Sequence, residues 1–418
     1  MLHLGMPRVV RLFNPELPRR VWLLQLGVLV NFFGNGLVAP FLVIYLHYGR
    51  HIPVGFAGSA VALGGITAVT SGLVAGSLAD RLGSRNILVA AMVSNAAAYL
   101  LYTQVSAPWQ AYVVGLLVGV GTGAYGPSSQ NLTASMVPPE RTAAAFAQNR
   151  VTAIIGLGAG GTVGGLIAAS GLDGYIRLLV LDAITFLAFA GISLLLPSGR
   201  VPPHSVASGG YRDVLRDRPF LGLVAVNVAL VAGGIAPMLG LLPAYAKGQA
   251  HVGEALIGVI YAANTLTIVI AQTPITRLVQ GRGRMRMLSA GALMWVASWT
   301  MCLAAGAWLA GGAAAVVIGV AASTYALGEC LYTAVMLPTA TALAPPSLRG
   351  RYLGVMGFSL QTGFLIGPSV GGVLLGAFPL ALPAACAAVC LAAAIGAGSV
   401  DRSLAPAVRQ NPIMAAAK

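Results

Sequence analysis

Charge is scarce in this chain of 418 residues. Asp, Glu, Lys and Arg make up 8% of it and 57% is hydrophobic, whereas an ordinary soluble domain is about 25% charged. A water-soluble fold of this length could not bury so much apolar surface. The lack of charge therefore excludes a soluble globular protein.

The residue patterns of an enzyme are also missing. No Ser/His/Asp set, metal-ligand spacing or phosphate-binding loop is present, and the five histidines fall in expected tails and loops. All four cysteines fall in apolar segments, so we expect neither a disulfide framework nor a metal site. We predict a protein that is not an enzyme and needs no cofactor, with a proton gradient as its energy source or simple facilitated diffusion.

Long apolar segments dominate what is present. A bilayer core about 30 Å thick takes about 20 apolar residues as a helix, whereas a transmembrane barrel would show short alternating segments. We therefore predict twelve transmembrane helices, near residues 21–47, 55–79, 87–105, 109–135, 143–170, 175–196, 220–246, 254–279, 287–308, 311–338, 351–376 and 379–400.

Positive charge is distributed unevenly along the chain. With a cytoplasmic N-terminus, most arginines fall on the cytoplasmic side, and the loops on the other side hold only Arg50, Arg177 and Lys247. Because this asymmetry follows the positive-inside rule, we expect a plasma-membrane protein with both termini in the cytoplasm. The net charge of +14 thus orients the protein in the bilayer and does not indicate a nucleic-acid partner.

The chain divides into two related halves. We predict a cytoplasmic tail over 1–20, a six-helix half over 21–196, a polar linker over 197–219, a second half over 220–400 and a tail over 401–418. A shift of 207 positions superposes Pro138 on Pro345, Tyr125 on Tyr332 and four glycines of the first half on four of the second. Parallel six-helix repeats are a known transporter plan, with the substrate site near mid-membrane between them.

Two motifs carry a family resemblance. GSLADRLGSRN, residues 76–86, resembles the loop signature between the second and third helices of major facilitator superfamily transporters. GFLIGPSVGG, residues 363–372, resembles the antiporter signature of that superfamily, although drug exporters usually carry it in the fifth helix, where this chain has Gly161 in place of the proline. Its signature residues are Gly363, Gly367, Pro368, Gly371 and Gly372. The resemblance, to the 12-helix drug:proton antiporter group, implies an all-α membrane protein with twelve helices in two pseudo-symmetric halves.

The loop signature predicts a cytoplasmic gate. Gly76 and Gly83 lack a Cβ and let the helix ends turn and approach closely. Asp80 can pair with Arg81 or Arg85, or face the positive end of another helix. The resemblance implies that Asp80 docks against the start of the eleventh helix when the cytoplasmic side closes. The alternative is a tight turn whose charges only set topology.

Polar residues inside the apolar segments predict a substrate cavity, because such residues are costly in a membrane, although small ones also hold helices together. In the family the first, fourth, seventh and tenth helices lie nearest the axis. Two family features are missing, an acidic residue in the first helix and an arginine in the fourth; the nearest embedded cation is Arg150, which can extend to the surface. The predicted cavity residues are Asn31, Asn35, Tyr125, Gln130, Asn264, Tyr325, Tyr332, Met336 and Gln361.

Two carboxylates, Asp182 and Glu329, lie deep in apolar segments and are the candidate proton carriers, since burial disfavours the charged form. Glu329 shares one helix face with Tyr325, Tyr332 and Met336, at i, i+4, i+7 and i+11. There it can bind a lipophilic cation together with the rings, exchange a proton, or simply bond to a neighbouring helix as the protonated acid. For Asp182 we expect pairing with Arg177 or capping of a neighbouring helix.

These observations predict a proton-coupled exporter of amphipathic or drug-like small molecules that works by alternating access. We expect a monomer whose partners are the substrate, protons and the lipid bilayer, with no nucleic acid. The alternative is a transporter of one defined solute, such as a sugar, siderophore or lipid, as a uniporter or symporter. A receptor or scaffold is disfavoured, because the repeat and the gate would then serve no purpose.

Overall fold

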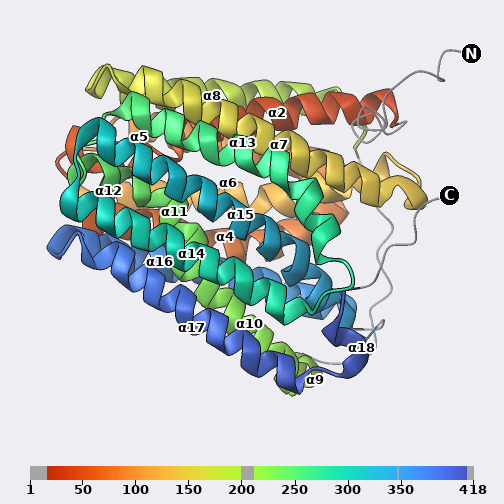
Figure 1. The fold of residues 1–418 in the computed structure, drawn as a ribbon. Coiled ribbons are helices and arrows are strands. Elements are labelled where there is room, and N and C mark those ends of the chain that lie inside the picture. The colour runs from red at the N-terminus through yellow and green to blue at the C-terminus, as the bar shows by residue number, and fades with distance from the viewer. Residues whose placement is uncertain (1–16, 199–210, 346–347, 412–418) are drawn as a thin grey trace, which may run out of the picture.

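The structure, a computed structural model, describes residues 17–198, 211–345 and 348–411. The described residues form a bundle of long helices, and their one strand-like contact is an isolated bridge between Gly283 and Gln410. The predicted all-α class is confirmed. α2 begins and α17 ends on the right in Figure 1; we call this side the terminal end and the opposite side the distal end.

The first half contains six helical rods. The first rod is interrupted: α2 ends just before Pro40, which has no N–H to continue the helical ladder, and two short segments follow. The rods are α2 (Arg19–Val38) with α3 (Leu42–Ile44) and the π-helical η1 (Tyr45–Gly49), then α4 (Val54–Leu82), α5 (Ser84–Tyr102), α6 (Pro108–Ser135), α7 (Pro139–Ala168) and α8 (Leu172–Leu194).

The second half repeats this arrangement, including an interrupted first rod. After the short α9 (Tyr211–Val214), that rod consists of α10 (Arg218–Leu230), the π-helical η2 (Val231–Ile235), α11 (Ala236–Gly240) and α12 (Leu242–Gly248). The others are α13 (Glu254–Val279), α14 (Arg284–Trp308), α15 (Gly311–Leu343), α16 (Arg349–Ala377) and α17 (Ala381–Ser403), and the short α18 (Pro406–Arg409) follows them.

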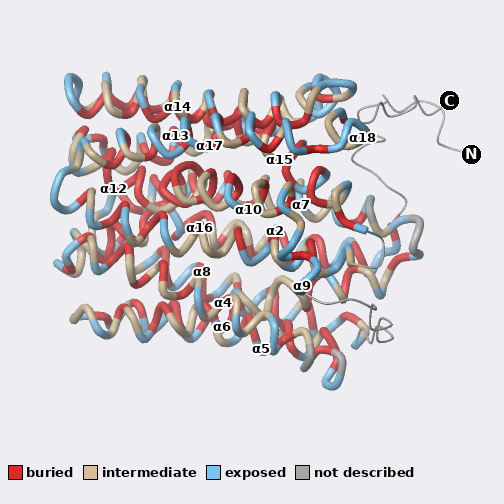
Figure 2. Tube along the Cα trace, turned by 90° about the horizontal axis from the view of Figure 1, so that it is seen from below, coloured by how far each residue is buried: buried red, intermediate tan, exposed pale blue. Residues whose placement is uncertain are grey.

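Ten helical segments of the described residues are long and apolar enough to cross a membrane. The two other long rods, α5 and α6, pack against each other and against α8 and α4 in the same bundle. The predicted twelve rods are therefore present, whereas length and composition support membrane crossing for ten. Many large apolar side chains, such as Leu73, Trp308 and Ile395, are exposed on the outside, and Figure 2 shows exposed and buried residues alternating along the peripheral helices.

Two helix pairs, α4 with α16 and α7 with α13, join the halves. Their close approach depends on glycine. A Cβ built on Gly58 would lie 2.7 Å from the carbonyl oxygen of Pro368, and one on Gly165 would lie 2.7 Å from that of Glu254. Both contacts lie toward the distal end, where α4 and α13 begin and α16 and α7 end. The halves are thus packed backbone to backbone at that end.

Candidate functional site

A central cavity of about 380 Å³ lies between the halves. Its walls are mostly apolar; Tyr99, Thr122 and Gln361 supply polar groups, and Leu239 and Phe364 are among the apolar residues. The structure thus places Gln361, one of the predicted cavity residues, on the wall of this cavity. The volume lies within the range of about 300 to 1,000 Å³ that is typical of small-molecule sites.

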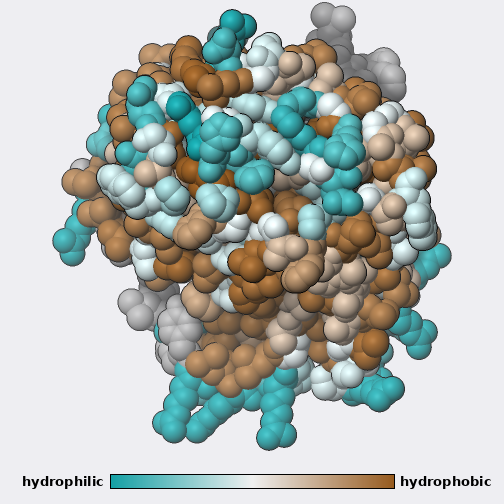
Figure 3. All heavy atoms as spheres, turned by 90° about the vertical axis from the view of Figure 1, so that its left-hand side faces the viewer, coloured by the Kyte–Doolittle hydropathy of each residue, from teal (hydrophilic) through white to brown (hydrophobic). Residues whose placement is uncertain are grey.

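A larger cavity of about 770 Å³ opens at the distal end. It lies beside the α4–α16 contact and is lined by His47, Tyr48, Phe56, Tyr112 and Gln249, among others. Figure 3 looks onto this end, where hydrophilic side chains gather over its upper part and apolar ones over its lower part. Sequence reasoning did not identify this cavity, because its walls come from loop-proximal residues of both halves.

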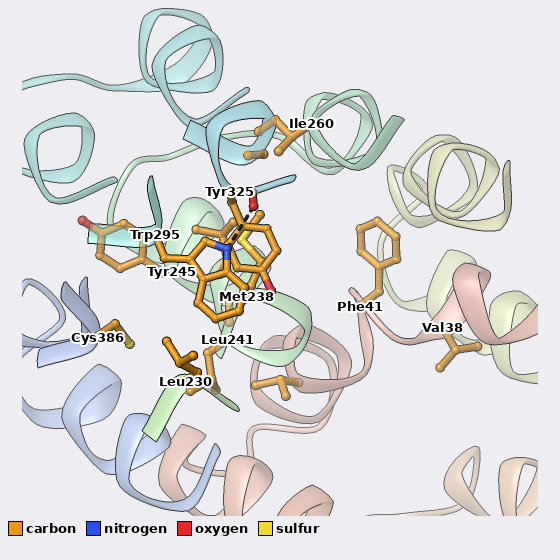
Figure 4. Close-up of a cluster of buried hydrophobic side chains, with 14 of the residues drawn as sticks. Val38, Phe41, Leu230, Met238, Leu241, Tyr245, Ile260, Trp295, Tyr325 and Cys386 are labelled. Atoms are coloured by element: carbon orange, nitrogen blue, oxygen red, sulfur yellow. Dashed lines mark hydrogen bonds between the residues drawn. The ribbon is translucent and has the colours of Figure 1, made fainter. Parts of the chain in front are cut away.

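Glu329 lies in α15 between two tyrosines that point into the second half. Tyr325 is buried and stacks on Trp295, with ring centroids 5.0 Å apart and planes 11° apart, and the Trp295 indole N–H donates to the Tyr325 carbonyl oxygen at 2.9 Å. Figure 4 shows this pair within a cluster of buried apolar side chains. Met336 is buried as well. Two of the three residues predicted to flank Glu329 in the cavity therefore belong to the core.

Tyr332 belongs to a network of hydrogen-bonded side chains inside the second half. Its hydroxyl donates to Asn227 Oδ1 at 2.7 Å, and Asn227 Nδ2 donates to Ser359 Oγ at 2.7 Å. This hydrogen-bond network joins α10, α15 and α16, which belong to the first, fourth and fifth rods of this half. The polar residues of α10 and α16 were not predicted, although an asparagine and a serine in apolar segments were the available signal.

Across the interface from Glu329 lies Arg150, about three turns into α7. Ile154, one turn further along α7, packs against a buried cluster formed by Ile268 of α13 with Ala326 and Cys330 of α15, the last of these next to Glu329 in the sequence. Arg150 is exposed and Glu329 half-buried, and the two are close enough to interact electrostatically. An opposite charge from the other half was not predicted for Glu329.

Of four other predicted cavity residues, three make local contacts and one is exposed. The Asn264 side chain donates to the Ala322 carbonyl oxygen at 3.0 Å and so ties α13 to α15. Asn35 donates to the Asn31 carbonyl oxygen at 2.9 Å within α2, and Gln130 is exposed. Tyr125, half-buried, contacts the rings of Phe32 and Phe189 at 6.1 and 6.3 Å.

Asn31 and Asp182 lie in the interior of the first half. Asn31 is buried, and the described cavities do not include it in their walls. Asp182 is also fully buried and accepts a hydrogen bond from Thr185 Oγ1 at 3.0 Å. The expected pairing with Arg177 is wrong, because that arginine is exposed and the carboxylate faces inward against Gly34 of α2.

The predicted gate loop binds to its own half. Gly83 ends α4 with φ +86°, and a Cβ there would lie 2.9 Å from the Ser198 carbonyl oxygen, so glycine is required. Arg85 donates to the Leu196 carbonyl oxygen at 3.1 Å, and Arg81 is exposed. Gly76 differs from expectation, since it lies inside α4 with open space beside it. The side chain of Asp80 lies outside the described part of the structure, so its latch role stays a prediction.

The glycine-rich signature of α16 meets two neighbours at once. Built Cβ atoms on Gly363 and Gly371 would lie 2.5 Å from side chains of Val231 and Leu241, in the interrupted first rod of the same half. Gly372 and the carbonyl oxygen of Pro368 instead face Gly58 of α4 in the other half. The motif thus lets one helix approach both a neighbour and the opposite half.

A polar cluster at the distal end crosses between the halves, and sequence reasoning missed it. Lys247 forms an ion pair with Glu254, Tyr175 donates to the same carboxylate at 2.8 Å, and the Lys247 ammonium donates to the Tyr175 hydroxyl at 2.9 Å. The ammonium also lies 5.0 Å from the ring centre of Tyr48. We call these four residues the distal cluster; two belong to each half.

Comparison with known proteins gives a consistent result. The family model described as Major Facilitator Superfamily matches residues 24–325 and 238–415. A relative from Bacillus subtilis (strain 168), the uncharacterised MFS-type transporter YqjV, is 23% identical over 85% of this chain and 86% of its own. Multidrug resistance protein MdtH of Aeromonas salmonicida (strain A449) is 24% identical over 84% and 87%. A Na(+), Li(+), K(+)/H(+) antiporter of Planococcus maritimus is 24% identical over 82% and 88%.

Solved structures share the fold at low identity. A nucleoside transporter, NupG, superposes with a TM-score of 0.74 at 13% identity, covering 92% of this chain and 99% of its own. A peptide transporter, POT, in complex with sulfate gives 0.75 at 15% identity, covering 94% and 95%.

Proposed function

The chain belongs to the major facilitator superfamily of transporters, and on that premise we propose that it exports amphipathic, drug-like cations in exchange for protons by alternating access. The observation that carries the proposal is the position of Glu329. It is half-buried at the interface between the halves, with Arg150 of the other half within electrostatic range.

A carboxylate and a guanidinium within electrostatic range of each other provide a means of coupling. A bound cation and a proton both neutralise the same carboxylate, so they exclude one another. Neutralising Glu329 also removes its attraction to Arg150, and because the two residues belong to different halves, the change acts on the contact between halves. A ligand shifts such an equilibrium only through different affinities for the two states.

The arrangement of the two ends supports a direction. Glycine contacts and the distal cluster hold the halves together at the distal end. We propose that the terminal end faces the cytoplasm, with the plasma membrane as the location, so that this arrangement is the one that receives substrate from the cytoplasm. Relatives named as multidrug resistance proteins and as a cation/proton antiporter agree with export in exchange for protons.

A single-solute transporter is the second candidate. The first rod carries Asn31 and Asn35 and no acidic residue, whereas drug exporters of the family commonly have an acid there. Under this alternative, one solute would saturate transport and lipophilic cations would not compete.

The test is substrate-induced proton release in proteoliposomes carrying the wild type, Glu329→Gln or Asp173→Asn. We expect lipophilic cations to release protons from the wild type and not from Glu329→Gln, which keeps the shape of the side chain and loses the titrating group. Asp173→Asn is the matched control, since it removes an exposed carboxylate at the start of α8. Equal uphill transport by Glu329→Gln and the wild type would contradict the proposal.

A further inference from the structure

Eight side chains of the first half have buried polar atoms without a hydrogen-bond partner among the described residues, and five of these side chains lie on the helices that surround the interior beside α8. These five come from four helices: Asn31 of α2, Asn95 of α5, Ser128 of α6, and Asp182 and Ser193 of α8. Each is at most 3% exposed. Buried polar groups normally bond to protein or to ordered water, so five unpartnered ones in a single helix bundle indicate bound water there.

These side chains face one interior. On α8, Asp182, Phe186, Phe189 and Ser193 follow the spacing i, i+4, i+7 and i+11, which places them on one helix face. Opposite this face, a Cβ built on Gly34 would lie 2.2 Å from Asp182 Oδ1, and one on Gly27 would lie 2.2 Å from the Phe189 ring.

The α5 and α6 residues meet the same interior. The ring of Tyr99, one turn from Asn95 on α5, lies 5.2 Å from the ring of Phe186. A Cβ built on Gly121 of α6 would lie 2.2 Å from Asn95 Oδ1. Tyr125, one turn further along α6, contacts the ring of Phe189. The α5 and α6 residues therefore border the same aromatic-lined interior as the α8 face.

The five polar side chains extend from the middle of the helix bundle toward the terminal end. Asp182 is followed on α8 by Ser193, about 16 Å nearer the terminal end at 1.5 Å per residue. Ser128 lies about 10 Å beyond Gly121 along α6 in the same direction. Asn31 and Asn95 lie between these levels, each within one turn of a residue in contact with the α8 face.

The end of this row of side chains that is farther from the terminal end, at Asp182, lies close to the central cavity. Tyr99 is part of the cavity wall and lies within electrostatic range of Asp182. The titratable groups facing Asp182 are this phenol and, beyond it, Tyr102 of α5; α2 presents Gly34 and no charge. Asp182 is thus separated from the cavity by one tyrosine.

We propose that the five side chains hold a chain of water molecules that carries protons between the terminal end and Asp182, which is a second proton-binding site behind the cavity wall. The carboxylate takes a proton from the last water of the chain and returns it by the same path. The rings of Phe186 and Phe189 give the path apolar walls. The proposal rests on proton coupling, but it concerns the first half and does not depend on Glu329.

The experiment uses the full-length protein in liposomes without substrate and records the infrared band of protonated carboxyl groups after a change of pH and after transfer to D₂O. We expect a titrating band that Asp182→Asn removes and Glu329→Gln retains in part. Asn95→Leu, which keeps the side-chain size, and Ser193→Ala should slow deuterium exchange of that band several-fold. Ser298→Ala, the matched control, removes a buried hydroxyl in the second half that donates to Ala321, and it should leave the exchange unchanged.

Three results would overturn the inference: no titrating band assigned to Asp182, unchanged exchange in folded Asn95→Leu, or a band that responds to Na⁺ at constant pH, which would indicate a cation site. Thermal unfolding of each variant shows whether it is folded. Failure of the proposed function is separate, because it would appear as normal proton release by Glu329→Gln whatever the behaviour of the Asp182 band.

Discussion

Glu329 shows how a single residue acquires its properties from a distant part of the chain. Its neighbours along α15, Tyr325 and Met336, are buried in the core, so they are not free to contact a substrate as the helix face predicted. Its opposite charge comes from Arg150, in the other half. The chemistry of the site therefore depends on the two residues together.

At the residue scale we predict that Arg150→Gln strengthens binding of a lipophilic cation by about tenfold, or about 1.4 kcal/mol. The guanidinium competes with the cation for Glu329, and glutamine cannot. Binding is measured by fluorescence titration in detergent. Arg150→Lys keeps the charge and should bind as the wild type does; weaker binding by Arg150→Gln would show that the arginine does not oppose the cation.

At the scale of elements, glycines decide which helices touch. In α16, Gly363, Gly367 and Gly371 contact the interrupted first rod of the same half, and Gly372 and Gly376 contact α4. A helix surface without Cβ atoms allows this close packing in a membrane. The same helix also has glycines with open space beside them, Gly350, Gly354 and Gly357, so a glycine-rich sequence by itself does not locate the contact.

We predict that Gly58→Ala separates α4 from α16 at the distal end, because its Cβ would lie 2.7 Å from a backbone oxygen that cannot move aside. Transport should fall sharply while the protein stays folded. The measurement is the distance between spin labels on Gln104 and Trp308, which we expect to lengthen.

Gly357→Ala is the matched control for that change. This substitution raises the helix propensity by the same amount, up to about 1 kcal/mol, and the new Cβ would lie in open space. A distal distance that is unchanged in Gly58→Ala, or equally lengthened in Gly357→Ala, would contradict a closing role for the α4–α16 contact.

At the scale of the whole molecule, two kinds of contact link the halves. The distal cluster links them through charge and hydrogen bonds, and the glycine pairs link them through backbone contact. Lys247 and Glu254 are 24% and 17% exposed in their side chains, so the pair is less screened than a surface salt bridge. Tyr175 brings the first half into the same set of hydrogen bonds. Opening the distal end must break these bonds.

We predict a coupling free energy of about 1 kcal/mol between Tyr175 and Glu254 in a double-mutant cycle of Tyr175→Phe and Glu254→Gln. Each single variant should shift the protein toward the distal-open form, measured by the same pair of spin labels. Additive effects, with no coupling, would mean that the cluster does not hold the halves together.

The sequence by itself determined the class of protein, the helical rods and the family. These depend on local composition: about 20 apolar residues suffice to specify a membrane helix, and the motifs at 76–86 and 363–372 are contiguous. Gly83 could also be predicted, since a positive φ at the end of α4 is a local requirement. Gln361 was placed on a cavity wall because polar side chains in apolar segments are costly unless they reach one.

Only the tertiary structure decided which of these residues meet. Asp182 turned away from Arg177 and into the bundle, Tyr325 stacked on Trp295, and Lys247 paired with Glu254 beside two tyrosines of the other half. Periodicity gives the face of a helix on which a residue lies, but not the helix that covers that face. Burial and charge pairing are set by residues of other helices, through packing that local sequence does not encode.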